Sequence, residues 1–502
     1  MRLLLLCFPA LFLVALLGTQ PPGIRDYANR ITPAELKAKV SILASDSFEG
    51  RETGTRGQRI AAAFIRSHFE MIGLTGPAED GFFQPIDLYL SAPGETYVKS
   101  GNKTFNHAEE VIYYGEADSG GEVTVPLVFA GLARNEDLNV LDVEGKAVLI
   151  RIDDGRLYNL PEAAKARQRG ARMILIWNTD TESAYDALVT QANAYVSNER
   201  PSLEKPVVHA PNEGSFVVSP QIVESLMGVP ASKLRALARE DPAQKALTKV
   251  RPTTIAFKSS MEVKTIQTEN VLGYLEGTDI RDEVVVITAH YDHIGISANG
   301  RGDRINNGAD DDASGTAAVM EIARVFAEAK REGNGPRRSM LFMTFAGEEK
   351  GLLGSEYYSA NPVFAMEKTV IDLNMDMIGR RDAQHEDSKP YVYIIGTGEP
   401  SSGLNQLSES VNRKYCHLEF DYTYNEREHP SRLFYRSDHW NFARHGVPII
   451  FYFDGIHEDY HKPSDEVDKI EFDLLARRAQ CVFYTAWEFA NRDERIAPEE
   501  GN

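Results

Sequence analysis

The fold is decided by residues 283–293, which read EVVVITAHYDH. The apolar run from Val284 to Ala289 lacks the alternation of a half-exposed strand, so it predicts a strand that is buried on both faces. Four further strands are predicted from apolar runs downstream: Met340 to Phe345, Val370 to Leu373, Val392 to Ile395 and Val447 to Phe453. Helical patterns lie between several of them, as at residues 319–326, where apolar side chains recur at i, i+3, i+4 and i+7. This order predicts an α/β domain with a mixed, largely parallel central sheet and helices on both faces.

Side chains that can bind metal ions follow the predicted strands at their carboxyl ends. After four different strands come His290 and Asp292, Glu348 and Glu349, Asp376, and His457 and His461. Asp310, Asp311 and Asp312 stand in a glycine-flanked turn that leads into a helix. Ligands of an open α/β sheet bind beyond the carboxyl ends of its strands, so these groups should meet at one edge. Because acidic groups collected there repel one another unless a cation neutralises them, the pattern favours a metal site over a set of solvated loop acids.

Five motifs around these residues follow one another along the chain. They are HYDH (290–293), GADDDASG (308–315), GEEKGLLGS (347–355), NMDMIG (374–379) and YHKPSD (460–465). Their order resembles the successive signatures of the two-zinc aminopeptidase family, which includes bacterial leucine aminopeptidases and aminopeptidase S and is related to glutamate carboxypeptidase. GRETG (50–54) and NVLGYLEG (270–277) resemble outlying motifs of that family. The resemblance runs from about residue 30 to about residue 490 and implies the zinc exopeptidase fold.

The resemblance also implies a metal-binding role for five residues. It implies that His290 and Asp376 bind one zinc ion and that Glu349 and His461 bind another. Asp311 would bridge the two, so the expected cofactor is two zinc ions per chain. Imidazole and carboxylate groups are suitable zinc ligands, and two neighbouring ions can activate a bridging water molecule.

Other residues near the ligands have expected roles in the reaction. Glu348 would be the general base that takes a proton from the metal-bridging water and passes it to the leaving amine. Tyr460 matches a position that hydrogen-bonds the developing oxyanion in the carboxypeptidase relatives. In this family the peptide bond between Asp311 and Asp312 is typically cis, and we expect a cis bond here.

Second-layer contacts and pocket residues are predicted as well. Asp292 is expected to hold the free ring nitrogen of His290, and Asp465 that of His461. Candidates for the substrate pocket are Arg436, Asp438, His439 and His457. A helix capped by Ser437 is the alternative interpretation of residues 436–439. His293, His439 and His457 are expected beside the ligands or in the pocket rather than on the metal.

The N-terminus predicts a targeting segment. Residues 1–20 combine the positive charge of Arg2 with an apolar run from Leu3 to Leu17 and small or polar residues before Pro21. This pattern is typical of a signal peptide, with an uncleaved anchor as the alternative. We therefore expect a secreted or periplasmic protein with no stable membrane insertion after cleavage.

The sequence predicts an inserted domain within a discontinuous peptidase domain. The expected ranges are 24–94 with 251–492 for the peptidase domain, 95–250 for the insert and 493–502 for a polar tail. The insert alternates strand and helix patterns and carries no cluster of metal ligands, so it should be a smaller β-rich α/β domain. Its segments DVEGKAVLI (142–150) and AAKARQRGA (163–171) resemble the protease-associated domain. That resemblance implies a role in covering or shaping the substrate cleft, and a passive structural insert is the alternative.

Composition narrows the ligands and the partners. The net charge of −20 argues against a nucleic-acid partner, because phosphate binding requires a basic face. Without Cys7 in the targeting segment, Cys416 and Cys481 remain, and the sequence leaves open whether they pair. Since no Cys-x-x-Cys pair exists, a metal ion here must use His, Asp and Glu side chains.

These observations predict a zinc-dependent exopeptidase, in the first place an aminopeptidase acting on peptides. Arg380, Arg381 and Arg436 keep a carboxypeptidase open, because such relatives grip a terminal carboxylate with arginines. A glutaminyl cyclase of the same fold would keep one zinc and lack the first histidine motif, which is intact here. A non-catalytic relative of the transferrin receptor type would have lost ligands, whereas the full set is present.

Overall fold

The computed structural model describes residues 22–115, 117–157, 160–196, 199–206, 214–240, 245–298, 302–398 and 402–496. The predicted signal peptide and the end of the predicted tail lie outside these ranges. The chain forms two compact units, which we call the main unit (Met1–Pro85 with Glu269–Asn502) and the inserted unit (Ile86–Thr268). It passes between them within the long strands β1 (Phe83–Pro93) and β11 (Met261–Leu275). The sequence placed the boundaries near residues 95 and 250, whereas each of these strands runs without a break from one unit into the other.

The main unit is built on a mixed sheet with a parallel centre. Its strands lie in the order β16 (Glu419–Asp421), β15 (Tyr391–Ile395), β17 (Ile449–Phe453), β14 (Thr369–Met375), β12 (Ile280–His290) and β13 (Arg338–Phe345), followed by β11, β1 and, beside β1, a short strand of the inserted unit. Strands β17, β14, β12 and β13 are parallel to one another, whereas β15 and β11 pair antiparallel on either side. Every residue of β13, β14 and β17 is buried, which confirms the prediction of a largely parallel sheet covered on both faces.

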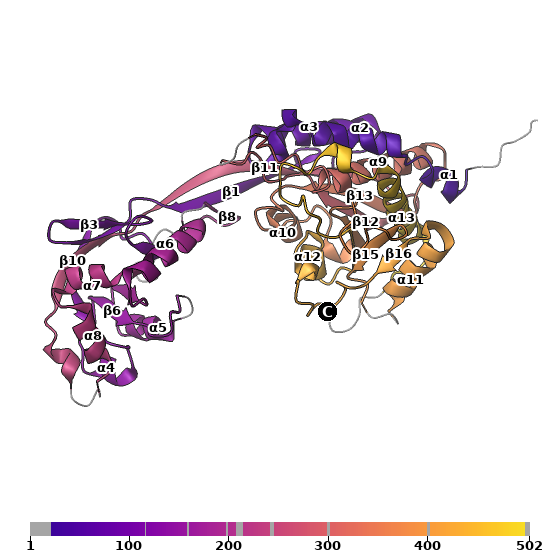
Figure 1. Ribbon diagram of the computed structural model, residues 1–502. Helices are drawn as coiled ribbons and strands as arrows, with labels where there is room; N and C mark the ends of the chain where they lie inside the picture. The colour runs from indigo at the N-terminus through magenta and orange to yellow at the C-terminus, as the bar shows by residue number, and fades with distance from the viewer. Residues whose placement is uncertain are drawn as a thin grey trace, which may run out of the picture. The chain divides into compact units, whose positions relative to one another are not determined.

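Helices cover both faces of this sheet (Figure 1). On one face lie α1 (Ile24–Ala28), α2 (Pro33–Leu43), α3 (Arg56–Met71), α9 (Ala313–Arg331), α11 (Gly403–Val411) and α13 (Phe472–Asn491). On the other lie α10 (Leu353–Ala360) and α12 (His439–Ala443). Neighbouring residues of β12 divide between the two cores, since Val285 packs with the first set and Val286 with the second. Helix α2 is capped by Thr32, whose hydroxyl accepts a hydrogen bond from the Glu35 N–H at 3.3 Å.

The inserted unit has an eight-stranded sheet of its own. The strands lie in the order β3 (Lys103–Asn106), β2 (Tyr97–Ser100), β10 (Thr253–Lys258), β5 (Val123–Phe129), β6 (Ala147–Arg151), β7 (Met173–Trp177), β9 (Ser215–Val217) and β4 (Ile112–Tyr114). Its helices are α4 (Asn135–Asn139), α5 (Pro161–Gln168), α6 (Glu182–Val196), α7 (Pro220–Met227) and α8 (Ala231–Ala238). A short strand, β8 (Arg200–Ser202), pairs antiparallel with β1. The unit is therefore α/β as expected, and its membership of the protease-associated class stays a prediction.

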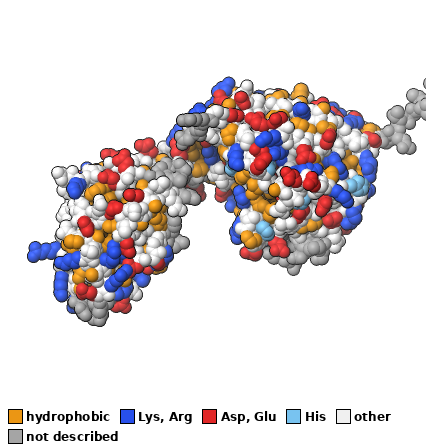
Figure 2. All heavy atoms as spheres, viewed as in Figure 1, with side chains coloured by type: hydrophobic (Ala, Val, Ile, Leu, Met, Phe, Trp, Pro, Cys, Tyr) orange, Lys and Arg blue, Asp and Glu red, His pale blue; other side chains and the backbone are white. Residues whose placement is uncertain are grey.

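The surface of the chain carries charges of both signs. On the face of the main unit in view, acidic and basic side chains are interspersed (Figure 2). Within the described ranges, no helix is both long and apolar enough to cross a membrane.

Cys416 and Cys481 form a disulfide that ties α13 to the end of a short helical segment, Asn412–Cys416. The two residues are 65 positions apart, and their Cα atoms are separated by 5.2 Å. Closing a loop of this length restricts the unfolded chain. We therefore expect the double variant Cys416→Ser/Cys481→Ser to lose about 2–4 kcal/mol of unfolding free energy. Denaturant titrations measure this loss, and wild-type protein unfolded with a reductant present should match the variant. An unchanged midpoint in both would contradict the prediction.

Candidate metal centre

The predicted ligands lie together at the carboxyl ends of the parallel strands. His290 is the last residue of β12, and Asp376 follows the end of β14. Glu349 comes shortly after β13, and His461 belongs to the loop after β17. Asp311 stands in the turn that precedes α9. Parallel neighbours end at a common edge, which is why residues so far apart in sequence can meet.

The spacing of the donor atoms fits metal ions. His290 Nε2 lies 3.2 Å from Asp311 Oδ1 and 3.4 Å from Asp376 Oδ1. His461 Nε2 lies 3.1 Å from Asp311 Oδ2 and 3.2 Å from Glu349 Oε2. Two ligand atoms on one tetrahedral zinc ion are about 3.3 Å apart, since each is roughly 2.0–2.1 Å from the metal. Asp311 therefore presents one oxygen to each imidazole, which is the arrangement required of a bridging carboxylate.

The other nitrogen of His290 fixes its tautomer. Nδ1 lies 3.1 Å from the main-chain oxygen of Asp292 and donates its hydrogen to it, so Nε2 is the nitrogen that would bind a metal ion. Asp292 is the predicted partner, but its main-chain oxygen takes the hydrogen bond, while its carboxylate lies 3.8 Å from Nδ1, at ion-pair distance. That carboxylate accepts hydrogen bonds from the Thr53 hydroxyl at 2.6 Å and the Glu348 N–H at 3.2 Å.

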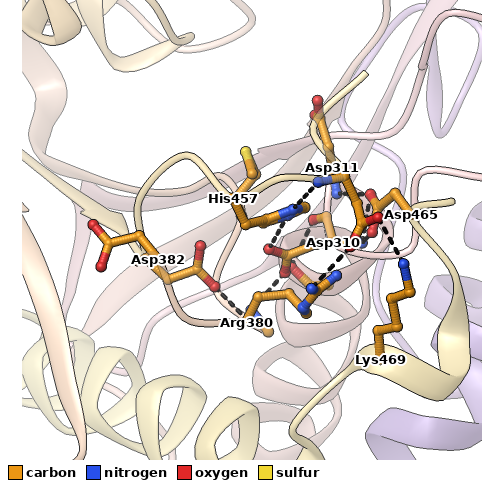
Figure 3. A network of polar contacts seen from close by, with 12 residues as sticks. Asp310, Asp311, Arg380, Asp382, His457, Asp465 and Lys469 are labelled. Carbon is orange, nitrogen blue, oxygen red and sulfur yellow. Dashed lines mark hydrogen bonds and ion pairs between the residues drawn. The ribbon is translucent and has the colours of Figure 1, made fainter. Parts of the chain in front are cut away.

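The triple-aspartate turn is held by main-chain hydrogen bonds. The peptide bond between Asp311 and Asp312 is cis, as the resemblance implied. Asp312 caps α9 by accepting from the Gly315 N–H at 2.9 Å. Asp465 was expected to orient His461, but its carboxylate accepts from the N–H groups of Asp310 and Asp311 at 3.1–3.2 Å (Figure 3). Buried N–H groups need an acceptor, and these two donate to Asp465. The prediction that Asp465 orients His461 is therefore wrong.

The carboxyl group of Glu348 lies beside the candidate ligands. Donor atoms of His290, Glu348 and Asp376 lie within 4.8 Å of one another, and so do those of His293, Asp311 and Glu349. Burial raises the pKa of Glu348 well above its ordinary range, and the nearby carboxylates of Glu349 and Asp376 raise it further. A carboxyl group so placed is suited to exchange a proton with a species held beside it.

His293 supports the ligand Glu349. Its Nδ1 lies 2.8 Å from Glu349 Oε1 and 3.8 Å from Asp311 Oδ2, and the ring is fully buried. The sequence predicted His293 near the ligands without a partner. Its place directly after Asp292 was the only signal in the sequence. Nothing in the motif indicates that it contacts Oε1 of Glu349, the oxygen that does not face His461.

A pocket opens beside the ligands. Its lining combines the polar residues His290, Asp311, Glu348, Asp376, Arg436, Tyr460 and His461 with the apolar residues Met377, Leu433, Phe451, Phe453 and Ile456. The Tyr460 ring stacks on His461 with 3.8 Å between ring centroids, and its hydroxyl accepts a hydrogen bond from Arg436 at 3.5 Å. Arg436 and Tyr460 thus lie where a substrate held at the ligands would contact them.

Three predicted pocket residues lie elsewhere. His439 is fully buried, with Nε2 at 2.9 Å from the Phe434 carbonyl, and burial lowers its pKa to about 3. Asp438 is fully buried at the start of α12, and burial raises its pKa to about 7. His457 faces Asp310, with Nε2 at 3.2 Å from Oδ2 (Figure 3). The pocket prediction was wrong for these residues because closeness in sequence to Arg436 or His461 does not set the direction of a side chain.

The alternative of a Ser437 cap is also wrong. Helix α12 begins at His439 with Asp438 in the cap position. The Ser437 hydroxyl accepts a hydrogen bond from Asn374 Nδ2 at 2.9 Å instead. This contact ties the start of α12 to the end of β14, directly before Asp376.

Known proteins are similar to this chain in sequence and in fold. Residues 270–486 match the model of peptidase family M28. Aminopeptidase YwaD of Bacillus subtilis is 24% identical over 383 residues, covering 74% of this chain and 68% of that protein. Leucine aminopeptidase 1 of Ajellomyces capsulatus is 30% identical over 223 residues, covering 42% and 54%. A solved aminopeptidase from Aneurinibacillus sp. strain AM-1 superposes with a TM-score of 0.53 at 20% identity, covering 96% and 99%, and so shows the shared fold. The chain spans about two thirds of YwaD and about half of the fungal relatives.

Proposed function

We propose, on the premise that the main unit belongs to peptidase family M28, that this protein is a zinc-dependent aminopeptidase that hydrolyses N-terminal residues from peptides. The observation that carries the proposal is the position of Asp311, with one carboxylate oxygen facing His290 and the other facing His461. The names of the relatives, aminopeptidase and zinc metalloprotease, support the same activity.

Two zinc ions per chain are part of the proposal. His290 and Asp376 would hold one ion and Glu349 and His461 the other, with Asp311 shared. Bound zinc would supply the lowered pKa of a water molecule and the polarisation of the scissile carbonyl. Elemental analysis of zinc-loaded, dialysed protein should give two zinc ions per chain. A single ion would favour the glutaminyl cyclase alternative.

The residues of the chain divide the remaining work. Glu348 lies within reach of the ligand set, so it is the base that accepts the proton and returns it to the leaving amine. Arg436 contacts the hydroxyl of Tyr460 and keeps it at the pocket wall. That hydroxyl can donate a hydrogen bond to the oxyanion that develops on the substrate carbonyl.

Tyr460→Phe tests this last role. Removing the hydroxyl while keeping the ring on His461 should lower kcat about 10²-fold with a small change in KM, because the hydrogen bond strengthens only in the transition state. Steady-state kinetics on an aminoacyl substrate measure both constants. Turnover equal to that of the wild type would exclude Tyr460 as the oxyanion donor.

The mode of attack is argued from the arginines. Arg380 pairs with Asp459 at 3.0 Å and Arg381 pairs with Glu471 at 3.0 Å, and neither of them is among the residues that line the pocket. Of the three arginines, Arg436 is the one in the pocket lining. One arginine in the lining gives little support to a mode that grips a carboxylate, and the aminopeptidase names of the relatives favour attack at the amino end.

A digest of blocked peptides decides between the two modes. Peptides with an acetylated N-terminus and a free C-terminus should resist cleavage, whereas peptides with a free N-terminus and an amidated C-terminus should shorten from the N-terminal end. Mass spectrometry reads the ladders. The reverse pattern would establish a carboxypeptidase.

Export and the role of the insert complete the proposal. We propose that residues 1–20 direct secretion or export to the periplasm, and N-terminal sequencing of exported protein tests this by locating the cleavage site. We also propose that the inserted unit is a protease-associated domain that shapes access to the cleft. Deleting it and finding unchanged rates on peptides of several lengths would favour a passive insert.

A further inference from the structure

Arg51 lies outside the stretch that matches the family model, yet it bonds to both segments that carry His290 and Asp311. Its side chain is fully buried, and its guanidinium donates four hydrogen bonds to main-chain carbonyls. Nε donates to Tyr291 at 2.9 Å, Nη1 to Leu43 at 2.6 Å and to Asn307 at 2.7 Å, and Nη2 to Gly308 at 2.9 Å. Tyr291 follows the ligand His290, and Gly308 opens the turn that carries Asp311.

All four acceptors are neutral. Within the described ranges, no carboxylate oxygen lies at ion-pair distance from this guanidinium, so a permanent charge is buried without a direct acidic partner. Negative charge surrounds it at longer range, from the carboxylates of Asp292, Asp311, Asp312 and Asp465. These acids offset part of the cost of burying the cation, and burial still lowers the pKa of Arg51.

The residues beside Arg51 fit the same place. We call residues 50–53 the clasp. The main-chain oxygens of Gly50 and Arg51 accept from the N–H groups of Gly295 at 3.0 Å and His293 at 3.2 Å, and the Thr53 hydroxyl donates to Asp292. Gly50 has a φ of +65°, and a Cβ there would lie 2.5 Å from the Asn306 oxygen. The clasp therefore lies between the segment that follows His290 and the segment that leads to Asp311.

We propose that Arg51 is a positioning residue that keeps these two ligand-bearing segments assembled before metal binds. The fork of the guanidinium reaches both segments at once, and its charge moderates the repulsion among the acids of the empty site. The inference rests on the proposed function, because it takes His290 and Asp311 as zinc ligands. When the ligands are already in place, zinc binding carries a smaller free-energy cost for ordering them. The wild-type chain should therefore bind zinc more tightly than a variant without Arg51.

Zinc affinity of the metal-free protein tests the proposal. Competition with a chromogenic chelator measures it in the full chain, independently of peptidase activity, for R51M, R51K and the control R338M. R51M should lose about 10–100-fold in zinc affinity, the usual effect of removing a group that orients metal ligands. R51K should fall between R51M and wild type, because an ammonium keeps the charge but offers three donors for four carbonyls.

Arg338 is the matched control. It is equally buried, donates to the main-chain oxygens of Phe489 and Arg492, and stands at the first residue of β13, the end of the strand opposite the metal ligands. R338M should lower the unfolding temperature and leave zinc affinity unchanged. If R338M loses as much affinity as R51M, the effect is general destabilisation and the proposal is overturned.

The outcomes separate the two proposals. Wild-type protein that binds no zinc would refute the proposed function itself. Wild-type protein that binds zinc, together with R51M and R51K of unchanged affinity, would refute only the role of Arg51. Should R51M fail to fold, as judged by circular dichroism, R51K carries the test alone, and wild-type affinity in R51K overturns the need for the forked guanidinium.

Discussion

Glu348→Gln is expected to lower kcat by about 10²–10⁴-fold, the range that a positioned general base contributes. Glutamine keeps the size of the side chain and a carbonyl oxygen, but it cannot accept a proton at neutral pH. The residue lies with His290 and Asp376 around one position of the site, where it can take a proton from a bound water molecule. Steady-state kinetics and zinc content, measured on the same preparation, check the prediction: turnover should collapse while the metal remains.

The neighbouring residue supplies the matched control. Glu349→Gln changes the same charge one position along the chain, but Glu349 contacts both His293 and His461. It should therefore lose zinc as well as turnover, and excess zinc should restore part of its activity. Glu348→Gln should show no such recovery. If Glu348→Gln retained more than about a tenth of wild-type kcat, the base would have to be a different group.

The fold followed from the sequence wherever a strand is a short apolar run between turn residues. Strands β15 and β17 end at the predicted residues Ile395 and Phe453, because each is a run of five buried side chains with no face left to expose. The limits of the inserted unit did not follow in the same way. Strand β11 alternates where it is exposed and becomes apolar where it enters the main unit, so one continuous strand belongs to both units.

The positions of four of the five candidate ligands were predictable, because parallel strands bring their carboxyl ends together. Asp311 stands in the turn before α9, and only the family resemblance implied its place in the site. The partners of the acids around them were not. The contacts of Asp292 and Asp465 depend on main-chain groups and on Thr53, and only the folded chain brings these groups near. The burial of His439 depends in the same way on which side of a five-residue helix faces the core. Arg51 stands in a motif of the sequence, but its role could not be predicted. Its four acceptors are main-chain carbonyl oxygens, and every residue carries one, so no side-chain pattern marks them.

Asp311→Asn should have the largest effect on the metal centre as a whole. The substitution keeps the shape but replaces one carboxylate oxygen by an NH₂ group, which is a donor and cannot bind a cation. Because the two oxygens face His290 and His461 separately, either orientation of the amide deprives one position of a ligand, and both positions lose the shared negative charge. Zinc content should fall below two ions per chain. The loss of several kcal/mol of transition-state stabilisation corresponds to a fall in kcat/KM on the order of 10³-fold or more.

An exposed acid of the same loop separates the bridge from a general charge effect. Asp303→Asn removes one negative charge close in sequence, where the carboxylate accepts a hydrogen bond from the Ile305 N–H at 3.1 Å. It should keep wild-type zinc content and kcat/KM, because water and salt screen the charge of an exposed side chain. Equilibrium dialysis against zinc, followed by elemental analysis of both variants, makes the comparison. Two tightly bound ions in Asp311→Asn would mean that the ions do not share this carboxylate. The assignment of all five ligands would then have to include His293, whose Nδ1 lies 3.8 Å from Asp311 Oδ2.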